Sequence, residues 1–280
     1  MERITSRQNA IVKRFRDLAR TSRGSAHGDG AADGGISAEV LLDGEHLLQE
    51  AIACDVPIEI AAFSDRQLEN ASSPVARIAT DVAQRGGRVL AVGEEILAAM
   101  SPVQHPSGVV AIGRARPVDV RVVMSATSDL PLVLVLASLQ DPGNVGAIVR
   151  TAAAFGASGV IALEGSANPF SWKALRGAMG GTFRLPIASR GALPDVISAA
   201  QELNVRLIAA VPRGGTPLPD LDLRQPTALI LGGEGGGLPP AAMTAVHDTV
   251  TIPMRKPVES LNVAIAASLV LYEASRQRTR

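Results

Sequence analysis

The first half of the chain alternates short apolar runs with stretches whose apolar residues recur at helical spacing. Short apolar runs bounded by turn residues predict strands, and the helically spaced stretches predict helices between them. This alternation is typical of an α/β layer, in which helices cover a sheet. The predicted strands are 38–44, 58–63, 88–92 and 108–114, and the predicted helices are 45–53, 74–84 and 94–100.

A second α/β pattern begins at residue 131. The run PLVLVLAS at 131–138 is apolar on both faces, as a buried parallel strand is. Gly156 stands where a helix over 144–155 would need a C-cap glycine. The remaining elements predicted in this half are strands at 160–163, 205–211 and 228–232 and a long closing helix from Ser260 to about Arg276.

The pattern divides the chain into two α/β domains. We predict a first domain over 1–115, a linker over 116–130 and a second domain over 131–280. The linker contains Pro117 and shows no clean periodicity. The glycine-rich stretch 24–35 cannot bury apolar surface and is expected to be a mobile loop within the first domain.

Composition narrows the function classes. The chain has 280 residues, 46% hydrophobic and 2% aromatic, with 27 basic and 27 acidic side chains. Taken at face value, neutrality disfavours a uniformly basic nucleic-acid binder, and so few aromatics disfavour a base-stacking platform. One cysteine excludes an internal disulfide, and the scattered histidines predict no metal site. No run reaches transmembrane length and the start lacks a signal-peptide core, so we expect a cytoplasmic protein without membrane contact.

Three segments follow strand ends, where open α/β sheets bind ligands. The first, 138–156, contains Asn144 and Arg150; the second is the glycine cluster 231–240 with Glu234; the third, 251–278, contains Ser260. Each segment also has a purely structural interpretation. In that interpretation Asn144 caps a helix, Arg150 extends to solvent, the glycine cluster is a plain loop and Ser260 caps a second helix. The segments lack the P-loop, GxGxxG and GxSxG patterns, which excludes a nucleotide-dependent dehydrogenase and a serine hydrolase.

The amino-acid sequences of these segments resemble the motifs of a known family. NVGAIVRTAAAFGA, LGGEGGGL and IPMRKPVESLNVA, in this order, resemble the three motifs of the SpoU (TrmH-type) RNA ribose methyltransferases of the SPOUT class. KALRGAMGGTFRLPI resembles the segment between the motifs. VLLDGEHLLQEAI and SPVQHPSGVVAI resemble the family's substrate-binding domain, which is similar to ribosomal protein L30e.

The resemblance implies transfer of a methyl group from S-adenosylmethionine to a ribose 2′-OH of RNA. It also implies a parallel-sheet domain with a C-terminal trefoil knot, through which two copies form a homodimer. Because a separate N-terminal domain is present, we favour 23S rRNA over tRNA; a tRNA ribose methyltransferase and a non-catalytic RNA-binding assembly factor are the alternatives. By motif position the catalytic residues are Arg150, Asn144, Glu234, Ser260 and Asn262, and the cofactor-binding residues are Gly232, Gly235, Ile252 and Leu261.

Two roles are open for Arg150. A guanidinium stays protonated in proteins. Arg150 therefore either passes a proton to a substrate phosphate in the bound state, or stays charged, orients the nucleotide and stabilises the developing alkoxide. The chain departs from the family pattern at Lys256, where glycine is frequent, and at Ala264, where serine is frequent.

Neutrality conceals a charge asymmetry that bears on RNA binding. Residues 1–23 carry a net charge of +5, residues 24–130 a net charge of −8 and residues 131–280 a net charge of +3. We expect a basic N-terminal arm to contact phosphates, so that deleting 1–23 weakens RNA binding and flattens its salt dependence. The predicted RNA-binding residues are Arg3, Arg7, Lys13, Arg14, Arg16, Lys173 and Arg176.

Overall fold

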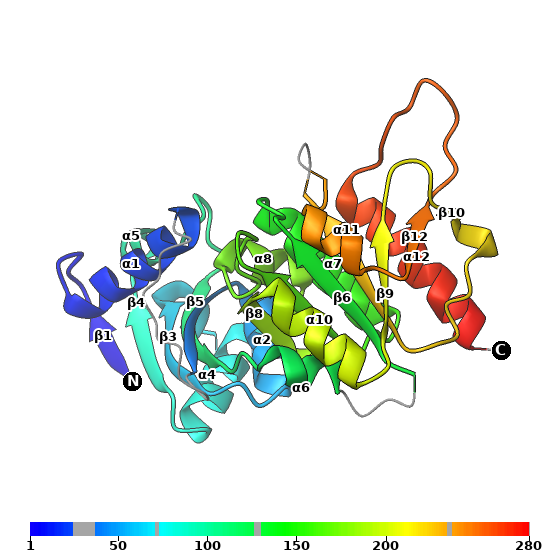
Figure 1. The fold of residues 1–280 in the computed structure, drawn as a ribbon. Coiled ribbons are helices and arrows are strands. Elements are labelled where there is room, and N and C mark those ends of the chain that lie inside the picture. Colours follow the sequence, from blue (N-terminus) through cyan, green and yellow to red (C-terminus); the bar gives the residue numbers. More distant parts are fainter. Residues whose placement is uncertain (25–36, 71–72, 126–129, 234–236, 280) are drawn as a thin grey trace. The chain divides into compact units, whose positions relative to one another are not determined.

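The chain folds into two compact units (Figure 1). The computed structural model describes residues 1–24, 37–70, 73–125, 130–233 and 237–279. The first unit comprises Met1–Arg116 together with Phe170–Phe183, and the second comprises Pro117–Pro169 together with Arg184–Arg280. The chain therefore passes between the units three times, where the sequence predicted a single crossing in a linker over 116–130.

The first unit contains a five-stranded mixed sheet in the order β1-β4-β3-β5-β2. β3 runs parallel to β4, and β5 runs antiparallel to both β2 and β3. The predicted strands and helices of this half lie within a residue or two of the observed ones. These are β2 (Ala38–Asp43), α2 (Glu45–Ala53), β3 (Ile58–Ser64), α4 (Pro74–Gln84), β4 (Arg88–Val92), α5 (Glu94–Met100) and β5 (Val109–Ala115). The short helix α3 (Asp65–Leu68) was not predicted.

The predicted N-terminal arm is part of this unit, not a free arm. β1 (Glu2–Ile4) pairs with β4, and α1 (Ala10–Gly24) buries Val12 and Phe15 completely. Apolar residues at helical spacing along α1 face the core, and the basic residues occupy its other sides. The proposed deletion of 1–23 would remove a strand and a core helix, so it cannot test RNA binding. Of the glycine-rich loop 24–35, Gly24 ends α1 and the rest lies outside the described residues.

A segment from the second half of the chain completes the first core. α8 (Trp172–Ala178) places Trp172, 7% exposed, in the same buried cluster as Phe15. Arg176 forms an ion pair with the buried Asp43 (Nη1–Oδ2, 3.7 Å). Burial raises the pKa of Asp43, against the opposing effects of the Ser101 hydroxyl and Arg176. The expectation that 131–280 forms one domain is wrong for this segment, because its apolar face packs on α1 and β2.

The second unit contains a seven-stranded sheet in the order β10-β12-β9-β11-β6-β7-β8, and every recorded strand pair is parallel. The chain passes from β6 through β7 to the β8 edge, then crosses back to β9 and later inserts β11 beside β6. The strands are β6 (Leu132–Ala137), β7 (Gly159–Leu163), β8 (Ile187–Gly191), β9 (Arg206–Ala210), β10 (Thr216–Pro217), β11 (Thr227–Gly232) and β12 (Asp248–Thr251).

This topology determines where a ligand can bind. The strand order reverses between β6 and β11, and in open α/β sheets the carboxyl ends of strands at such a reversal form the ligand crevice. The motif segments predicted from the sequence leave the sheet at the carboxyl ends of β6, β11 and β12. The helices of this unit are α6 (Val120–Met124), α7 (Pro142–Ala154), α10 (Leu193–Glu202), a short 3-10 helix (Leu218–Asp220), α11 (Pro240–Ala245) and α12 (Val263–Arg278). The short helix α9 (Gly181–Arg184) lies at the border, with only Arg184 in this unit.

The structure differs from the predicted elements of this unit in several places, and β8, α10, β10 and α11 were not predicted. The stretch expected to be a linker contains α6, whose Val123 and Met124 belong to the second core because its apolar side packs on α10 and β7. Helix α7 begins at Pro142, two residues earlier than predicted, and α12 begins at Val263, three residues later. No helix of the described part combines the length and the apolar character needed to cross a membrane.

Candidate active site

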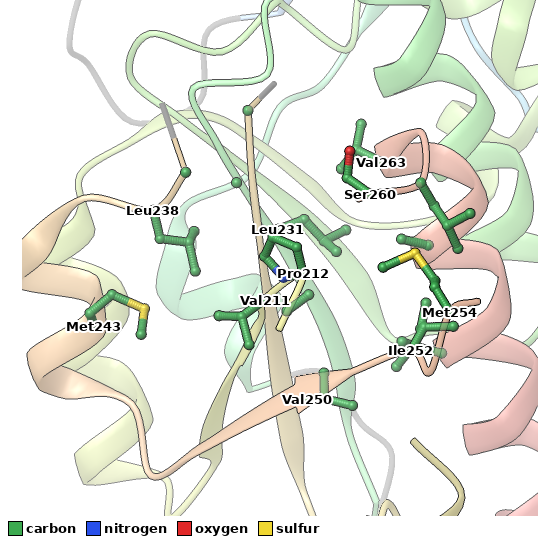
Figure 2. Close-up of a pocket in the computed structure, with 17 residues that line it drawn as sticks. Val211, Pro212, Leu231, Leu238, Met243, Val250, Ile252, Met254, Ser260 and Val263 are labelled. Carbon is green, nitrogen blue, oxygen red and sulfur yellow. The ribbon is translucent and has the colours of Figure 1, made fainter. Parts of the chain in front are cut away.

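A cavity of about 450 Å³ opens at the carboxyl ends of β9, β11 and β12, beside the first turns of α12 (Figure 2). Three of the four predicted cofactor-binding residues line it: Gly232, Ile252 and Leu261. The fourth, Gly235, lies outside the described residues, as does Glu234. Ser260, predicted as catalytic, also lines the cavity. Its size is within the range of about 300–1,000 Å³ typical of small-molecule sites.

Most of the wall is apolar, and sequence reasoning did not identify much of it. The unpredicted lining residues include Val211, Pro212, Leu238, Met243, Met254 and Val263. They come from the loop after β9, from α11 and the loop before it, and from the two sides of the β12–α12 loop (Figure 2). These segments each follow a strand end, and that position could have indicated from the sequence that they lie near the site. Which of their side chains point into the cavity depends on tertiary packing.

The glycines of the second motif are required by close backbone contacts. A Cβ at Gly233 would lie 2.2 Å from the carbonyl oxygen of Ser138, at the end of the neighbouring strand β6. A Cβ at Gly232 would lie 2.9 Å from backbone atoms of Gly237, which forms a bridge with Gly233. The cluster is therefore a tight cradle in which backbone replaces side chains, so a ligand can approach the chain closely.

Asn144 and Asn262 join the first and third motifs. The amide nitrogen of Asn262 donates to Asn144 Oδ1 at 3.0 Å. Asn262, not Ser260, caps α12, because its Oδ1 accepts from the backbone N–H groups of Ala264 and Ile265. Asp141 caps α7 in the same way. The cap interpretations of Asn144 and Ser260 are therefore wrong: Asn144 accepts a hydrogen bond from Asn262, and Ser260 lines the cavity.

Arg150 lies on the exposed side of α7. Among the described residues, no acidic side chain pairs with it, and it does not line the cavity. The next residue, Thr151, packs on α12, where Ser268 Oγ lies 3.3 Å from Thr151 Oγ1. Arg150 therefore lies on the side of α7 next to the side that contacts α12. Sequence reasoning missed the Thr151–Ser268 contact, because pairing between two helices leaves no local signal.

The predicted RNA-binding residues fall into two groups. Three are engaged with carboxylates of the first unit: Arg3 with Asp65 at 2.6 Å, Arg7 with Glu95 at 3.5 Å, and Arg14 with both Glu59 and Glu39. The pKa of Arg14 is raised, chiefly by its hydrogen bond to Glu59, and the pKa of Glu59 is lowered by the same bond.

The side chains of the other group are exposed. Lys13 and Arg16 are exposed on α1, and no carboxylate of the described residues pairs with either. Lys173 is exposed on α8, with its Nζ 5.7 Å from the centre of the Trp172 ring. Arg176 is exposed, although it also contacts Asp43.

Comparison with known proteins decides the family. The model of the SpoU rRNA Methylase family matches residues 131–272, which span β6 through most of α12 and thus the whole cavity. The chain belongs to the SpoU rRNA methylase family. A Synechocystis protein named "Uncharacterized tRNA/rRNA methyltransferase" is 35% identical over 98% of this chain and 94% of its own length. The 23S rRNA (guanosine(2553)-2'-O)-methyltransferase RlmP of Bacillus subtilis is 28% identical over 83% of this chain and 86% of its own length.

Solved structures of SpoU methylases extend the likeness to both units. An AdoMet-bound rRNA methyltransferase from Sinorhizobium meliloti matches with a TM-score of 0.81 and 28% identity, over 98% of this chain and 97% of that one. The SpoU methyltransferase AviRb from Streptomyces viridochromogenes, also bound to AdoMet, matches with a TM-score of 0.80 and 26% identity, over 97% and 99%. The protein is an RNA 2′-O-ribose methyltransferase, and its cofactor is S-adenosylmethionine.

The cavity of this SpoU methylase fits its cofactor. The cradle at Gly232 and Gly233 offers backbone N–H and C=O groups, and the apolar wall suits the uncharged parts of an adenosyl group. When bound, S-adenosylmethionine supplies a methyl group on a positively charged sulfur. Among the described residues, no group of three or more His, Cys, Asp or Glu side chains is placed to hold a metal ion.

Proposed function

We propose that this enzyme methylates a ribose 2′-OH of ribosomal RNA and that its substrate is 23S rRNA. The observation that carries the proposal is the extent of the likeness to the Sinorhizobium rRNA methyltransferase, which includes the first unit as well as the catalytic one. The first unit supplies a second surface for a large, structured RNA. The RNA substrate and the single cysteine agree with the cytoplasmic location expected from the sequence.

Catalysis by this chain is assigned to the two joined motifs. When bound, S-adenosylmethionine would supply the methyl group to the 2′-oxygen and leave as the neutral thioether, and the hydroxyl proton would pass to solvent water. We assign Arg150 to the nucleotide, where its charge stabilises the developing alkoxide. Asn144, Asn262, Ser260 and Glu234 are assigned to holding the ribose and the cofactor in line, because positioning alone can supply roughly 7–11 kcal/mol.

Mapping 2′-O-methyl groups tests the proposal. RNA from a strain lacking the gene, compared with RNA from its parent, should lack one 2′-O-methyl group in 23S rRNA and keep all those in tRNA. Restoring the gene should restore the group. A missing group in tRNA, with rRNA unchanged, would replace the proposal with the tRNA alternative.

We propose that the unpaired cations of α1 and α8 contact RNA phosphates. Lys13, Arg16 and Arg20 recur along one side of α1, and Arg14, which binds the sheet carboxylates, lies on another side. α8 packs against α1 and adds Lys173. Arg20 was not singled out from the sequence, but it is exposed like Lys13 and Arg16. This surface replaces the free arm as the source of phosphate contacts.

Replacing Lys13, Arg16 and Arg20 together by glutamine should weaken RNA binding and flatten its salt dependence. Each lost phosphate contact reduces the slope of log K against log salt by about 0.7–0.9. The measurement is RNA affinity by filter binding over a range of salt, with S-adenosylmethionine binding as the control for folding. The matched variant Arg85→Gln, which removes an arginine paired with Asp55, should leave the slope unchanged. An unaltered slope in the triple variant would contradict this surface.

We also propose that two copies pair through α12. Ile265, Leu269 and Tyr272 are 54%, 40% and 57% exposed and lie on one side of this helix, which otherwise packs on the second unit. Large apolar side chains grouped on one helix face are typical of an interaction surface. Sedimentation of the full chain should give the mass of a dimer; a monomer at micromolar concentration would contradict the proposal.

A further inference from the structure

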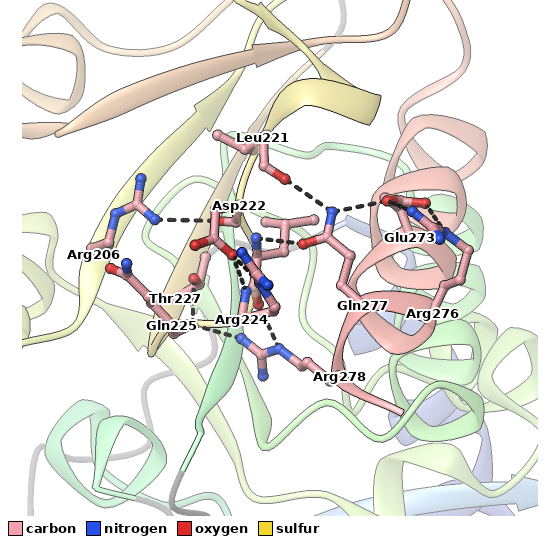
Figure 3. A network of polar contacts seen from close by, with 11 residues as sticks. Arg206, Leu221, Asp222, Arg224, Gln225, Thr227, Glu273, Arg276, Gln277 and Arg278 are labelled. Carbon is pink, nitrogen blue, oxygen red and sulfur yellow. Dashed lines mark hydrogen bonds and ion pairs between the residues drawn. The ribbon is translucent and has the colours of Figure 1, made fainter. Parts of the chain in front are cut away.

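The C-terminal end of α12 is held by two consecutive side chains, Gln277 and Arg278 (Figure 3). Arg278 donates to backbone carbonyl oxygens of two separate stretches of chain, one before β6 and one before β11. The acceptors are Leu130 at 2.6 Å, Leu223 at 2.7 Å, Gln225 at 2.8 Å and Pro131 at 3.4 Å. Burial lowers the pKa of Arg278, so the contacts form in a partly desolvated place where hydrogen bonds are strong.

Gln277 extends the same attachment. Its side-chain nitrogen donates to Leu221 O at 2.9 Å, and its side-chain oxygen accepts from Leu223 N at 2.8 Å. The side chain thus pairs with both kinds of backbone group of a segment that lies outside the strands. Arg206 of β9 donates to Asp222 O at 3.1 Å and holds the same segment from the other side.

The attachment and the cavity lie at opposite ends of the same strands. The carbonyls bound by Arg278 belong to the chain just before β6 and just before β11. The cavity lies at the other end of β11, where Leu231 and Gly232 face Val263, Ala266 and Val270 of α12. At 1.5 Å per residue, α12 spans about 24 Å between these two ends.

The contacts along α12 do little to fix its position along its own axis. Its buried side chains are Val263, Ala264, Ala267, Val270, Leu271 and Ala274, and all but Leu271 are small. Apolar contacts are non-directional, so a face of small side chains offers few ridges that would resist a shift along the helix. Hydrogen bonds are directional and do resist it. The polar contacts near the cavity, Asn262–Asn144 and Ser268–Thr151, tie α12 to α7 and not to the strands.

We propose that Arg278 and Gln277 are positioning residues for cofactor binding. By attaching the far end of α12 to the chain that enters β6 and β11, they set how far the helix extends toward the cavity. They thereby set the place of Val263, Ala266 and the cap residue Asn262 against the glycine cradle. Neither side chain lines the cavity, so the effect is transmitted through the helix as a rigid rod.

The test measures S-adenosylmethionine binding to the full-length protein by calorimetry for Arg278→Ala, Arg278→Lys and Gln277→Ala. Losing the net value of one hydrogen bond corresponds to about a tenfold rise in Kd. We expect that rise for both Arg278 variants, because lysine offers a single point of donation and cannot span the four carbonyls. A smaller rise is expected for Gln277→Ala. Binding stoichiometry should stay at that of the parent protein.

Arg276→Ala is the matched control. Arg276 is on the same turn, but it is exposed and pairs with Glu273 of its own helix. Glu273 also accepts a hydrogen bond from Gln277 and keeps it when Arg276 is removed, so the loss of Arg276 should leave Kd unchanged. An unchanged Kd in the Arg278 and Gln277 variants overturns the proposal. So does a fall in stoichiometry at constant Kd, since that is the result of partial unfolding alone. If Arg278→Ala does not fold, the Kd and the binding stoichiometry of Arg278→Lys and Gln277→Ala test the proposal instead.

Discussion

Arg150→Ala is expected to reduce methyl transfer by at least about 10²–10³-fold, the usual cost of removing one donor aimed at developing negative charge. Arg150 is exposed on α7, and no carboxylate of the described residues forms an ion pair with it. Its removal therefore costs the fold little. Because it does not line the cavity, the Kd for S-adenosylmethionine should not change. The measurement is single-turnover methylation of total rRNA from the deletion strain, alongside calorimetry.

The control and a companion variant separate the two roles of Arg150. Arg121→Ala removes an exposed arginine of the same unit, paired with Glu202, and should leave the rate unchanged. Arg150→Lys keeps the charge and loses the planar fork, so it should retain part of the rate if charge is what matters. Near-parental turnover in Arg150→Ala would exclude both roles.

Trp172→Ala is expected to destabilise the first unit by about 3–5 kcal/mol, as removal of a large buried aromatic side chain does. Trp172 is 7% exposed in the core built by Val12 and Phe15, although it follows β7 of the other unit in the chain. Urea unfolding followed by circular dichroism should show an early transition that the parent protein lacks. S-adenosylmethionine binding without urea should persist, because the cavity lies wholly in the second unit.

Two neighbouring substitutions calibrate this effect. Lys173→Ala removes the cation above the Trp172 ring and should cost only about 0.5–1 kcal/mol. Trp172→Phe should cost much less than Trp172→Ala, because the indole N–H has no hydrogen-bond partner among the described residues. If Trp172→Ala costs no more than Lys173→Ala, α8 does not belong to the first core.

The sequence predicted the elements well where burial leaves a periodic signal. The strand β6 was evident from PLVLVLAS, and Gly156 ends α7 with the positive φ expected after a helix. The cavity residues Gly232, Ile252 and Leu261 were found because a motif resemblance places residues that periodicity cannot.

The errors have two physical sources. At the N-terminus, counting charges hid the apolar spacing of Val12, Phe15 and Ala19, which packs α1 on the sheet and engages Arg14 with carboxylates. Elsewhere the missing information was tertiary. Nothing local in WKALRGA says which core receives Trp172, and nothing local pairs Thr151 with Ser268 or Arg278 with Leu130. Contacts between distant segments depend on the packed fold.

The return of α8 to the first unit has a consequence for how the protein is made. The ribosome completes residues 1–116 well before it reaches Trp172, and at about 5–20 residues per second the gap lasts several seconds. During that time the first unit has its sheet and α1 but lacks the indole ring that fills its core. The nascent chain therefore carries an incompletely packed domain while β6, α7 and β7 are being synthesised. The N-terminal unit can mature only after translation has entered the methylase unit, so the two halves of this enzyme reach the folded state in an interleaved order.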